Sequence, residues 1–203
     1  MDVTNVSAEA ETFTCNVYLV EGDRTVLVDA GAWDGVVESI REHTETLDAV
    51  VLTHQHSDHI AQLDAVLDAF EAPLFSYAAH PRRDAELENG DQVFIGDEPF
   101  DVVYTPGHAD DHVSFVSETT LFSGDVVVHD DGAFEYGSFG RTDMPGQSRE
   151  RLIESIETLL DAVGDGVEHM YSGHGSAFHG DVRDIVATAL ERAEKRKPKY
   201  PDE

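Results

Sequence analysis

Seven side chains in this sequence are of the types that bind transition metals. Four of them stand within six residues of one another, and each of the other three directly follows a glycine. They are His54, His56, Asp58, His59, His108, Asp125 and His174. Zinc and iron bind imidazole and carboxylate readily, and seven such ligands are enough for two metal ions side by side. Two metals can hold one hydroxide against an electrophile, so the pattern predicts metal-assisted hydrolysis.

A purely structural interpretation explains this pattern poorly. A single histidine in a loop is usually a surface residue, and one His-x-His pair is common without a metal. A cluster of four ligands in six residues, joined by three ligands that follow glycines, is rare without a metal role. The metal site is therefore the favoured interpretation.

Short apolar runs must position these ligands. The hydrophobic pattern predicts strands at 13–20, 25–29, 49–52, 73–76, 101–104, 113–116, 120–122 and 167–171, and helices at 33–43, 58–70, 148–163 and 181–196. Ser148 is the expected N-cap of the third helix, and Gly164 its expected end. The ligand-bearing loops follow predicted strands, so they can converge at one edge of a sheet.

Length and charge narrow the classes of partner. The 203 residues are enough for one domain spanning 1–203, and the formal net charge is −29, from 13 basic and 42 acidic residues. Such a field repels nucleic acid and anionic membrane surfaces, so we expect neither as a partner. We expect a small-molecule substrate, and the sequence leaves the oligomeric state open.

The acidic excess runs along the whole chain. Lysine occurs only at Lys195, Lys197 and Lys199. Such a composition predicts adaptation to high salt, where counterions screen the self-repulsion. Cys15 is the one cysteine, which excludes an intramolecular disulfide, and we expect it to be buried. With no secretion signal and no membrane-spanning run, we expect a cytoplasmic protein in a high-salt cytosol.

The stretch Thr53–Ile60 resembles the signature of the metallo-β-lactamase-fold hydrolases. The later ligand motifs come in that family's order, and the likeness extends from residues 28–31 to 173–175. The resemblance implies an α/β (α+β) fold, the four-layer αββα sandwich. It also implies that Asp29 supports the site without binding metal. Alternatively, Asp29 only forms the turn that follows its strand.

The resemblance also implies a division of the ligands between two metals. One metal takes His54, His56 and His108, and the other takes Asp58, His59 and His174. Asp125 bridges the two. Two Zn²⁺ ions are expected, with iron or manganese as the other metals that such ligands accept.

Within this superfamily the chain is most similar to short glyoxalase-II-like thioesterases. Residues 137–146 resemble their GRTD-type loop, which the related persulfide dioxygenases share. Arg141 is a candidate for holding a substrate carboxylate, because its planar fork suits that geometry. Alternatively, Arg141 pairs with Asp143 and only fixes the loop. Tyr136 is a further candidate to line the pocket.

The expected activity is hydrolysis of a thioester or related activated ester by a metal-bridging hydroxide, which Asp58 orients as well as binding metal. One alternative is a mononuclear iron persulfide dioxygenase, which by resemblance would use His56, His108 and Asp125. A lactonase ranks lower. Longer glyoxalase II enzymes carry a C-terminal helical domain that helps to bind glutathione, whereas here one helix and a short tail follow His174. The thiol of the substrate is therefore left open.

A few other polar residues lie outside these motifs. The basic residues from Lys195 to Lys199 either bind substrate in an oligomer or form a solvated helix end. His112 and His129 are possible pocket residues. The remaining histidines are expected at the surface.

Overall fold

The computed structural model describes residues 1–195. Backbone contacts divide the chain into two compact units, Met1–Phe100 and the part that begins at Asp101. The boundary falls inside strand β8 (Glu98–Tyr104). The single domain expected from the sequence stays a prediction. Within the described part of the chain, no helix has the length and apolar character needed to span a bilayer.

The first sheet has the strand order β1-β2-β3-β4-β5-β6. Its strands are β1 (Asp2–Asn5), β2 (Tyr18–Glu21), β3 (Val26–Val28), β4 (Ala49–Val51), β5 (Leu74–Ser76) and β6 (Arg83–Glu86). The first three pair antiparallel, and β3 to β6 pair parallel. Since β3 and β4 run parallel, their carboxyl ends meet at one edge of the sheet. The residues that follow these two strands therefore begin as neighbours.

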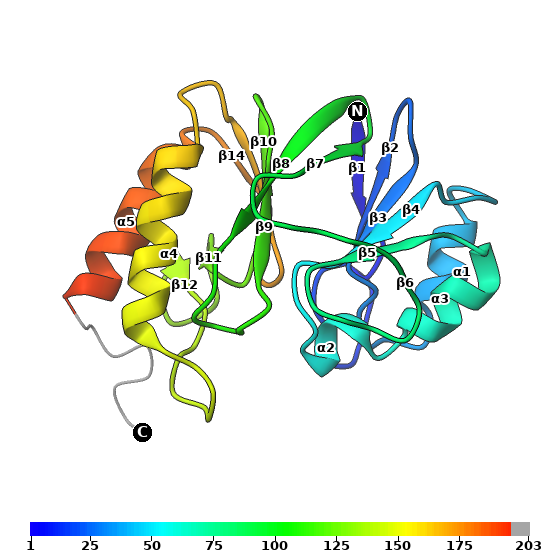
Figure 1. Cartoon of the computed structure of the whole chain (residues 1–203), viewed down its shortest axis with the longest axis horizontal. Coiled ribbons are helices and arrows are strands. Elements are labelled where there is room, and N and C mark those ends of the chain that lie inside the picture. The colour runs from blue at the N-terminus through cyan, green and yellow to red at the C-terminus, as the bar shows by residue number, and fades with distance from the viewer. Residues whose placement is uncertain (196–203) are drawn as a thin grey trace. The chain divides into compact units, whose positions relative to one another are not determined.

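Two helices cover one face of this sheet. They are α1 (Val36–Arg41) and α3 (Leu63–Phe70), which lie alongside each other in the cyan part of Figure 1. Their buried residues, such as Ile40 and Val66, pack in one apolar cluster with Leu27 and Val50 of the sheet. Burial of this face holds the sheet rigid behind the loops at its edge.

The second sheet has the order β14-β13-β10-β9-β8-β7. Besides β8, its strands are β7 (Gln92–Ile95), β9 (Val113–Val116), β10 (Thr120–Gly124), β13 (His169–Ser172) and β14 (Phe178–His179). A small two-stranded sheet pairs β11 (Val127–Val128) with β12 (Ser138–Phe139). Strands β10 and β13 run parallel, so the loops that carry Asp125 and His174 leave the same edge.

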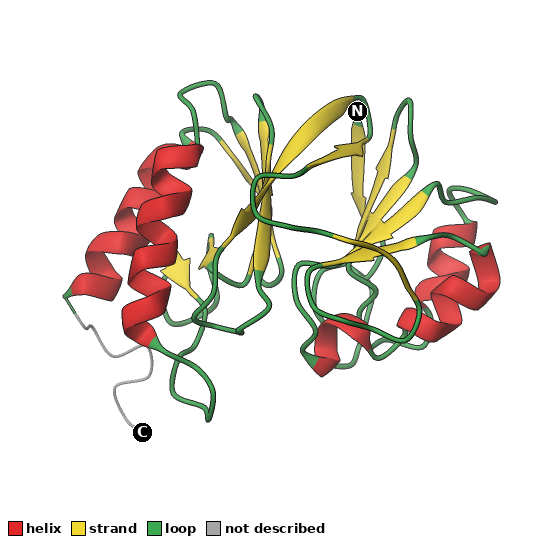
Figure 2. Cartoon of the chain, in the orientation of Figure 1, coloured by secondary structure: helices red, strands yellow, loops and turns green. Residues whose placement is uncertain are grey.

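The long helices of the second unit are α4 (Arg149–Ala162) and α5 (Val182–Glu194), red in Figure 2. Leu152 and Ile156 of α4 share an apolar cluster with Ile185 of α5 and with Met170 of β13. Ser148 caps α4 as expected, because its side chain accepts a hydrogen bond from the Arg151 N–H. The end predicted for the last helix, Arg196, lies outside the described residues, as do Lys197 and Lys199.

The structure corrects two predicted elements. The strand expected at 13–20 begins only at Tyr18, and Phe13 is exposed. The helix expected at 58–70 is two helices, α2 (Ser57–Ile60) and α3. It breaks because the His59 carbonyl accepts from the N–H groups of Ala30 and Gly31, both at 2.9 Å. The Gln62 N–H in turn donates to the Gly31 carbonyl. Hydrogen bonds to the segment around Gly31 therefore replace the hydrogen bonds that a continuous helix would form within itself.

Candidate metal centre

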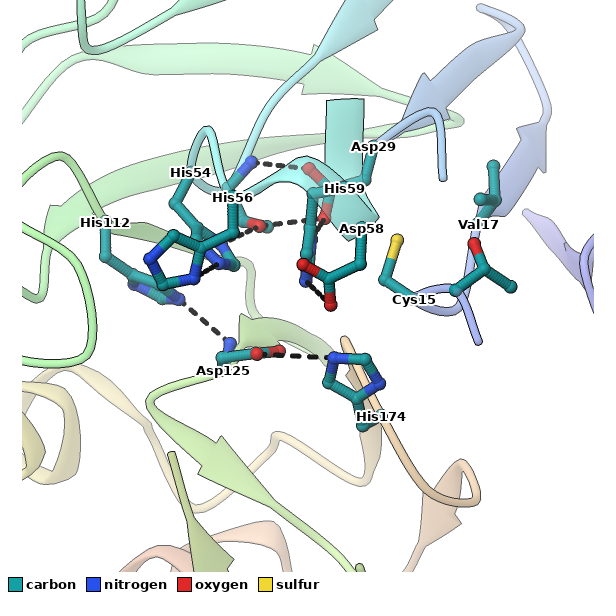
Figure 3. A network of polar contacts seen from close by, with 12 residues as sticks. Cys15, Val17, Asp29, His54, His56, Asp58, His59, His112, Asp125 and His174 are labelled. Atoms are coloured by element: carbon teal, nitrogen blue, oxygen red, sulfur yellow. Dashed lines mark hydrogen bonds and ion pairs between the residues drawn. The ribbon is translucent and has the colours of Figure 1, made fainter. Parts of the chain in front are cut away.

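In the first unit, the loop after β4 and helix α2 bring four predicted ligands together (Figure 3). His54 Nε2 lies 3.1 Å from His56 Nδ1. The ring centroids of His54 and His59 are 4.0 Å apart. His59 Nε2 lies 3.9 Å from the Asp58 carboxylate. Four groups that can bind a cation thus gather on one short segment.

Asp29 supports this cluster through hydrogen bonds to Thr53 and His59. Its buried carboxylate accepts hydrogen bonds from the Thr53 N–H, the Thr53 hydroxyl and His59 Nδ1, each at 2.8 Å. Asp29 has a φ of 61°, a left-handed conformation that aspartate tolerates better than most residues. Because Nδ1 of His59 bonds to Asp29, Nε2 is the ring nitrogen directed at Asp58. This geometry suits the supporting role that the family resemblance gives Asp29.

A second relay orients His54. The Thr53 hydroxyl donates to Asp29, so its oxygen can accept from His54 Nδ1 at 3.1 Å. Nε2 of His54 then faces His56 as an acceptor. Two nitrogens bound to one tetrahedral zinc are about 3.3 Å apart, given Zn–N bonds of about 2.0–2.1 Å. The 3.1 Å between His54 and His56 fits either a shared cation or a single N–H···N bond.

Cys15 lies beside this cluster and is fully buried, as expected. Its backbone N–H donates to the Asp58 carbonyl at 3.2 Å. Its sulfur falls within 4.8 Å of ligand atoms of Asp29 and His59. The segment that precedes β2 is therefore tied directly to the ligand-bearing helix.

In the second unit, the Asp125 carboxylate lies between two imidazoles. Its Oδ2 is 3.3 Å from His108 Nε2 and 3.4 Å from His174 Nε2. Asp125 and His108 are nearly buried, while about a quarter of the His174 side chain is exposed. Both separations are close to the spacing of about 3.3 Å between two ligands of one tetrahedral metal. This unit thus joins its three predicted ligands.

Close packing around His108 requires glycine at two places. His108 Nδ1 lies 3.0 Å from the Arg141 carbonyl, and a Cβ at the neighbouring Gly140 would lie 2.1 Å from the Asp125 carbonyl oxygen. A Cβ at Gly107 would lie 2.4 Å from the backbone nitrogen of Leu152 in α4. The GRTD-type loop therefore supports His108 through its main chain.

The two predicted substrate-binding residues are engaged elsewhere. The Arg141 guanidinium forms a two-point ion pair with Asp143, at 2.9 and 2.7 Å, which is the loop-fixing alternative. The Tyr136 hydroxyl donates to Asp184 of α5 at 2.7 Å. Burial raises the pKa of Tyr136 to about 12, and the bond to Asp184 adds to the effect. Tyr136 therefore stays protonated and anchored to the helix.

Sequence reasoning missed the role of His112. This residue is fully buried, and its Nε2 accepts a hydrogen bond from the Asp125 N–H at 2.9 Å. The available signal was its position four residues after His108, but that spacing alone did not separate a pocket residue from a supporting one.

The donor set fits transition-metal ions. Five imidazoles and two carboxylates supply nitrogen and oxygen ligands, the mixture that zinc and non-haem iron accept. Where a histidine's Nδ1 contacts an oxygen, as in His54, His59 and His108, Nε2 is the nitrogen left to face another ligand. Histidine ligands in metalloproteins are usually oriented in this way.

Comparison with known proteins agrees with this chemistry. A family model described as the metallo-beta-lactamase superfamily matches residues 10–83. A hydroxyacylglutathione hydrolase of Aliivibrio fischeri is 36% identical over 161 residues, which cover 75% of this chain and 60% of the relative. One from Hydrogenovibrio crunogenus is 33% identical over 132 residues, which cover 63% of this chain and 49% of the relative.

Solved structures show the same architecture. The crystal structure of BLEG-1 B3 metallo-beta-lactamase matches with a TM-score of 0.66 and 28% identity, covering 88% of this chain and 91% of that one. The mixed α/β fold with several sheets is thus the metallo-β-lactamase fold, as expected. The chain spans only about half to three fifths of the length of the two curated relatives.

Proposed function

We propose that this chain, which belongs to the metallo-β-lactamase superfamily, is a metal-dependent hydrolase of thioesters. The observation that carries the proposal is the Asp125 carboxylate oxygen held 3.3 and 3.4 Å from two imidazole nitrogens. The four clustered ligands of the first unit and the hydroxyacylglutathione hydrolases among the relatives support it further.

The proposed ligand sets are those implied by the family resemblance. By that resemblance, His54, His56 and His108 would hold one metal ion, Asp58, His59 and His174 would hold the other, and Asp125 would be shared between them. When bound, divalent metals lower the pKa of water and polarise the substrate carbonyl. Asp58 accepts the proton of the attacking water at a carboxylate oxygen.

Other residues hold the reacting groups in place. Thr53 bonds to Nδ1 of His54, and Asp29 bonds to Nδ1 of His59. Nε2 of each ring is therefore the nitrogen left to bind metal. The Arg141 carbonyl bonds to Nδ1 of His108 in the same way. With these rings held before substrate arrives, little ordering remains to be done during the reaction.

The net charge argues against one class of substrate. A surface field from a net charge of −29 disfavours polyanions, so the proposed substrate is a small-molecule thioester rather than nucleic acid. The Arg141–Asp143 pair would have to open before Arg141 could hold a substrate carboxylate. The acyl group and the thiol are left to a substrate panel.

We further propose that the protein works in a high-salt cytosol. Exposed carboxylates repel one another in dilute buffer, and added ions screen that repulsion within about 3 Å at 1 M salt. The melting temperature should therefore rise steeply between dilute buffer and molar KCl, as followed by circular dichroism. A melting temperature that stays flat across this range would remove the basis for salt adaptation.

Metal content tests the proposed function most directly. The protein is purified in high salt without chelators and analysed by elemental mass spectrometry, followed by assay on hydroxyacyl thioesters of glutathione and coenzyme A. Two zinc ions per chain with thioester turnover is the expected result. One iron per chain with oxygen uptake on a persulfide would instead support the dioxygenase, and a chain that takes up no metal would exclude both.

A further inference from the structure

A buried chain of polar side chains runs beneath the ligands of the second unit. Thr105, His112 and Ser114 are each fully buried. The Asp125 N–H donates to His112 Nε2 at 2.9 Å, and His112 Nδ1 lies 2.8 Å from Thr105 Oγ1. Thr105 Oγ1 lies 3.1 Å from Ser114 Oγ, which donates to the Ser123 carbonyl at 3.2 Å. Fully buried polar groups linked in this way constrain one another.

The first and last hydrogen bonds of this network determine the position of every proton in it. A backbone N–H can only donate, so Nε2 of His112 must be the acceptor and the neutral ring carries its hydrogen on Nδ1. That hydrogen is donated to Thr105. Because Ser114 donates to the Ser123 carbonyl, its oxygen accepts from the Thr105 hydroxyl. The order of donors is therefore unique, and both nitrogens of His112 are occupied within it.

The chain of bonds starts and finishes on the same segment. Ser123 lies in β10 and Asp125 directly follows that strand, while the strand's register with β13 shifts between Phe122 and Gly124. Such an irregularity turns backbone groups away from the sheet ladder. His112 supplies an acceptor for the Asp125 N–H at this point.

The same bonds close the loop that carries His108. Thr105 and His112 stand at its two ends, and the Thr105 N–H also donates to the His112 carbonyl at 2.9 Å. The base of the His108 loop is thereby joined to the backbone of Asp125. This connection explains how Nε2 of His108 and the Asp125 carboxylate are kept 3.3 Å apart.

We propose that His112, with Thr105 and Ser114, is a positioning residue that sets Asp125 and His108 in register for metal binding. The inference rests on the proposed function for the metal, and it assigns His112 neither to the substrate pocket nor to the ligand set. Groups that orient metal ligands through hydrogen bonds typically change metal affinity by about 10–100-fold when they are removed.

Thr105 offers the cleanest test, because valine has its shape and lacks its hydroxyl. Thr105→Val should lower zinc affinity about 10–100-fold in chelator competition, whereas Thr105→Ser, which keeps the hydroxyl, should stay near wild type. In the metal-free protein, Thr105→Val should also speed hydrogen exchange of the Asp125 amide. Thr158→Val, at an exposed site on α4, is the matched control and should change neither quantity.

A second variant keeps the test decisive if Thr105→Val does not fold. Ser114→Ala breaks the same relay with a smaller change of volume and should shift both quantities in the same direction. Wild-type zinc affinity and wild-type Asp125 exchange in the folded variant would overturn the inference. If the wild-type protein binds no metal, the proposed function fails, and a rapidly exchanging Asp125 amide in that protein would overturn the positioning role separately.

Discussion

Replacing Asp29 with alanine should lower the free energy of unfolding by about 3–5 kcal/mol, because each buried donor that loses its acceptor costs about 1–3 kcal/mol. The substitution removes the acceptor for the Thr53 N–H, the Thr53 hydroxyl and His59 Nδ1, all inside the first unit. Alanine also fits the left-handed φ of 61° less well than aspartate. Urea denaturation of the metal-free protein at constant high salt measures the loss.

Two further variants serve as controls for the Asp29→Ala measurement. Asp68→Asn on α3 changes an exposed carboxylate paired with Arg82 and should alter stability by no more than about 0.5 kcal/mol. Asp29→Asn keeps the shape but presents an N–H₂ group toward His59, which favours the tautomer with hydrogen on Nε2. It should cost less stability than alanine and still lower zinc affinity by about 10–100-fold. An Asp29→Ala protein as stable as Asp68→Asn would show that the carboxylate does not organise the unit.

Replacing Asp58 with asparagine should reduce kcat for thioester hydrolysis by about 10²–10⁴-fold, the usual contribution of a positioned acid or base. The amide has nearly the same shape but cannot take up a proton. The Asp58 side chain is partly exposed, and the described bond that ties this residue to Cys15 uses its backbone carbonyl, so the fold should be kept. Steady-state kinetics at measured metal content give the comparison.

The matched control is Asp64→Asn, an identical change at an exposed position on α3. It should keep wild-type kcat and wild-type metal content. If Asp58→Asn retains near wild-type kcat at full metal loading, Asp58 has no role in proton transfer. Metal loss in proportion to lost activity would assign Asp58 to binding alone.

The clustering of the first four candidate ligands could be predicted from the sequence because these residues are local. His54, His56, Asp58 and His59 lie on one segment, so their proximity needs no knowledge of the fold. The order of the later motifs indicated the family, and membership of that family indicated the fold. Long amphipathic elements such as α4 were also predicted closely, since their stripe of apolar residues is long enough to be unambiguous.

What could not be predicted depends on contacts between distant residues. The break between α2 and α3 arises from the Ala30 and Gly31 amides, which a periodicity of 58–70 cannot reveal. The sequence left the partner of Arg141 open, and in the structure its guanidinium pairs with the Asp143 carboxylate. The function of His112 depends on a backbone amide thirteen residues away. Each of these features depends on a tertiary contact that the local sequence pattern does not reveal.

The carbonyl of His59, bonded to two amides of the turn after β3, has a consequence for how the chain acquires its ion. Main-chain bonds already fix the shape of the ligand segment. We therefore expect the first unit to fold without metal, unlike a zinc finger. We expect the ligand segment to be preformed before metal binds, so ions of similar size should replace one another without refolding of the first unit.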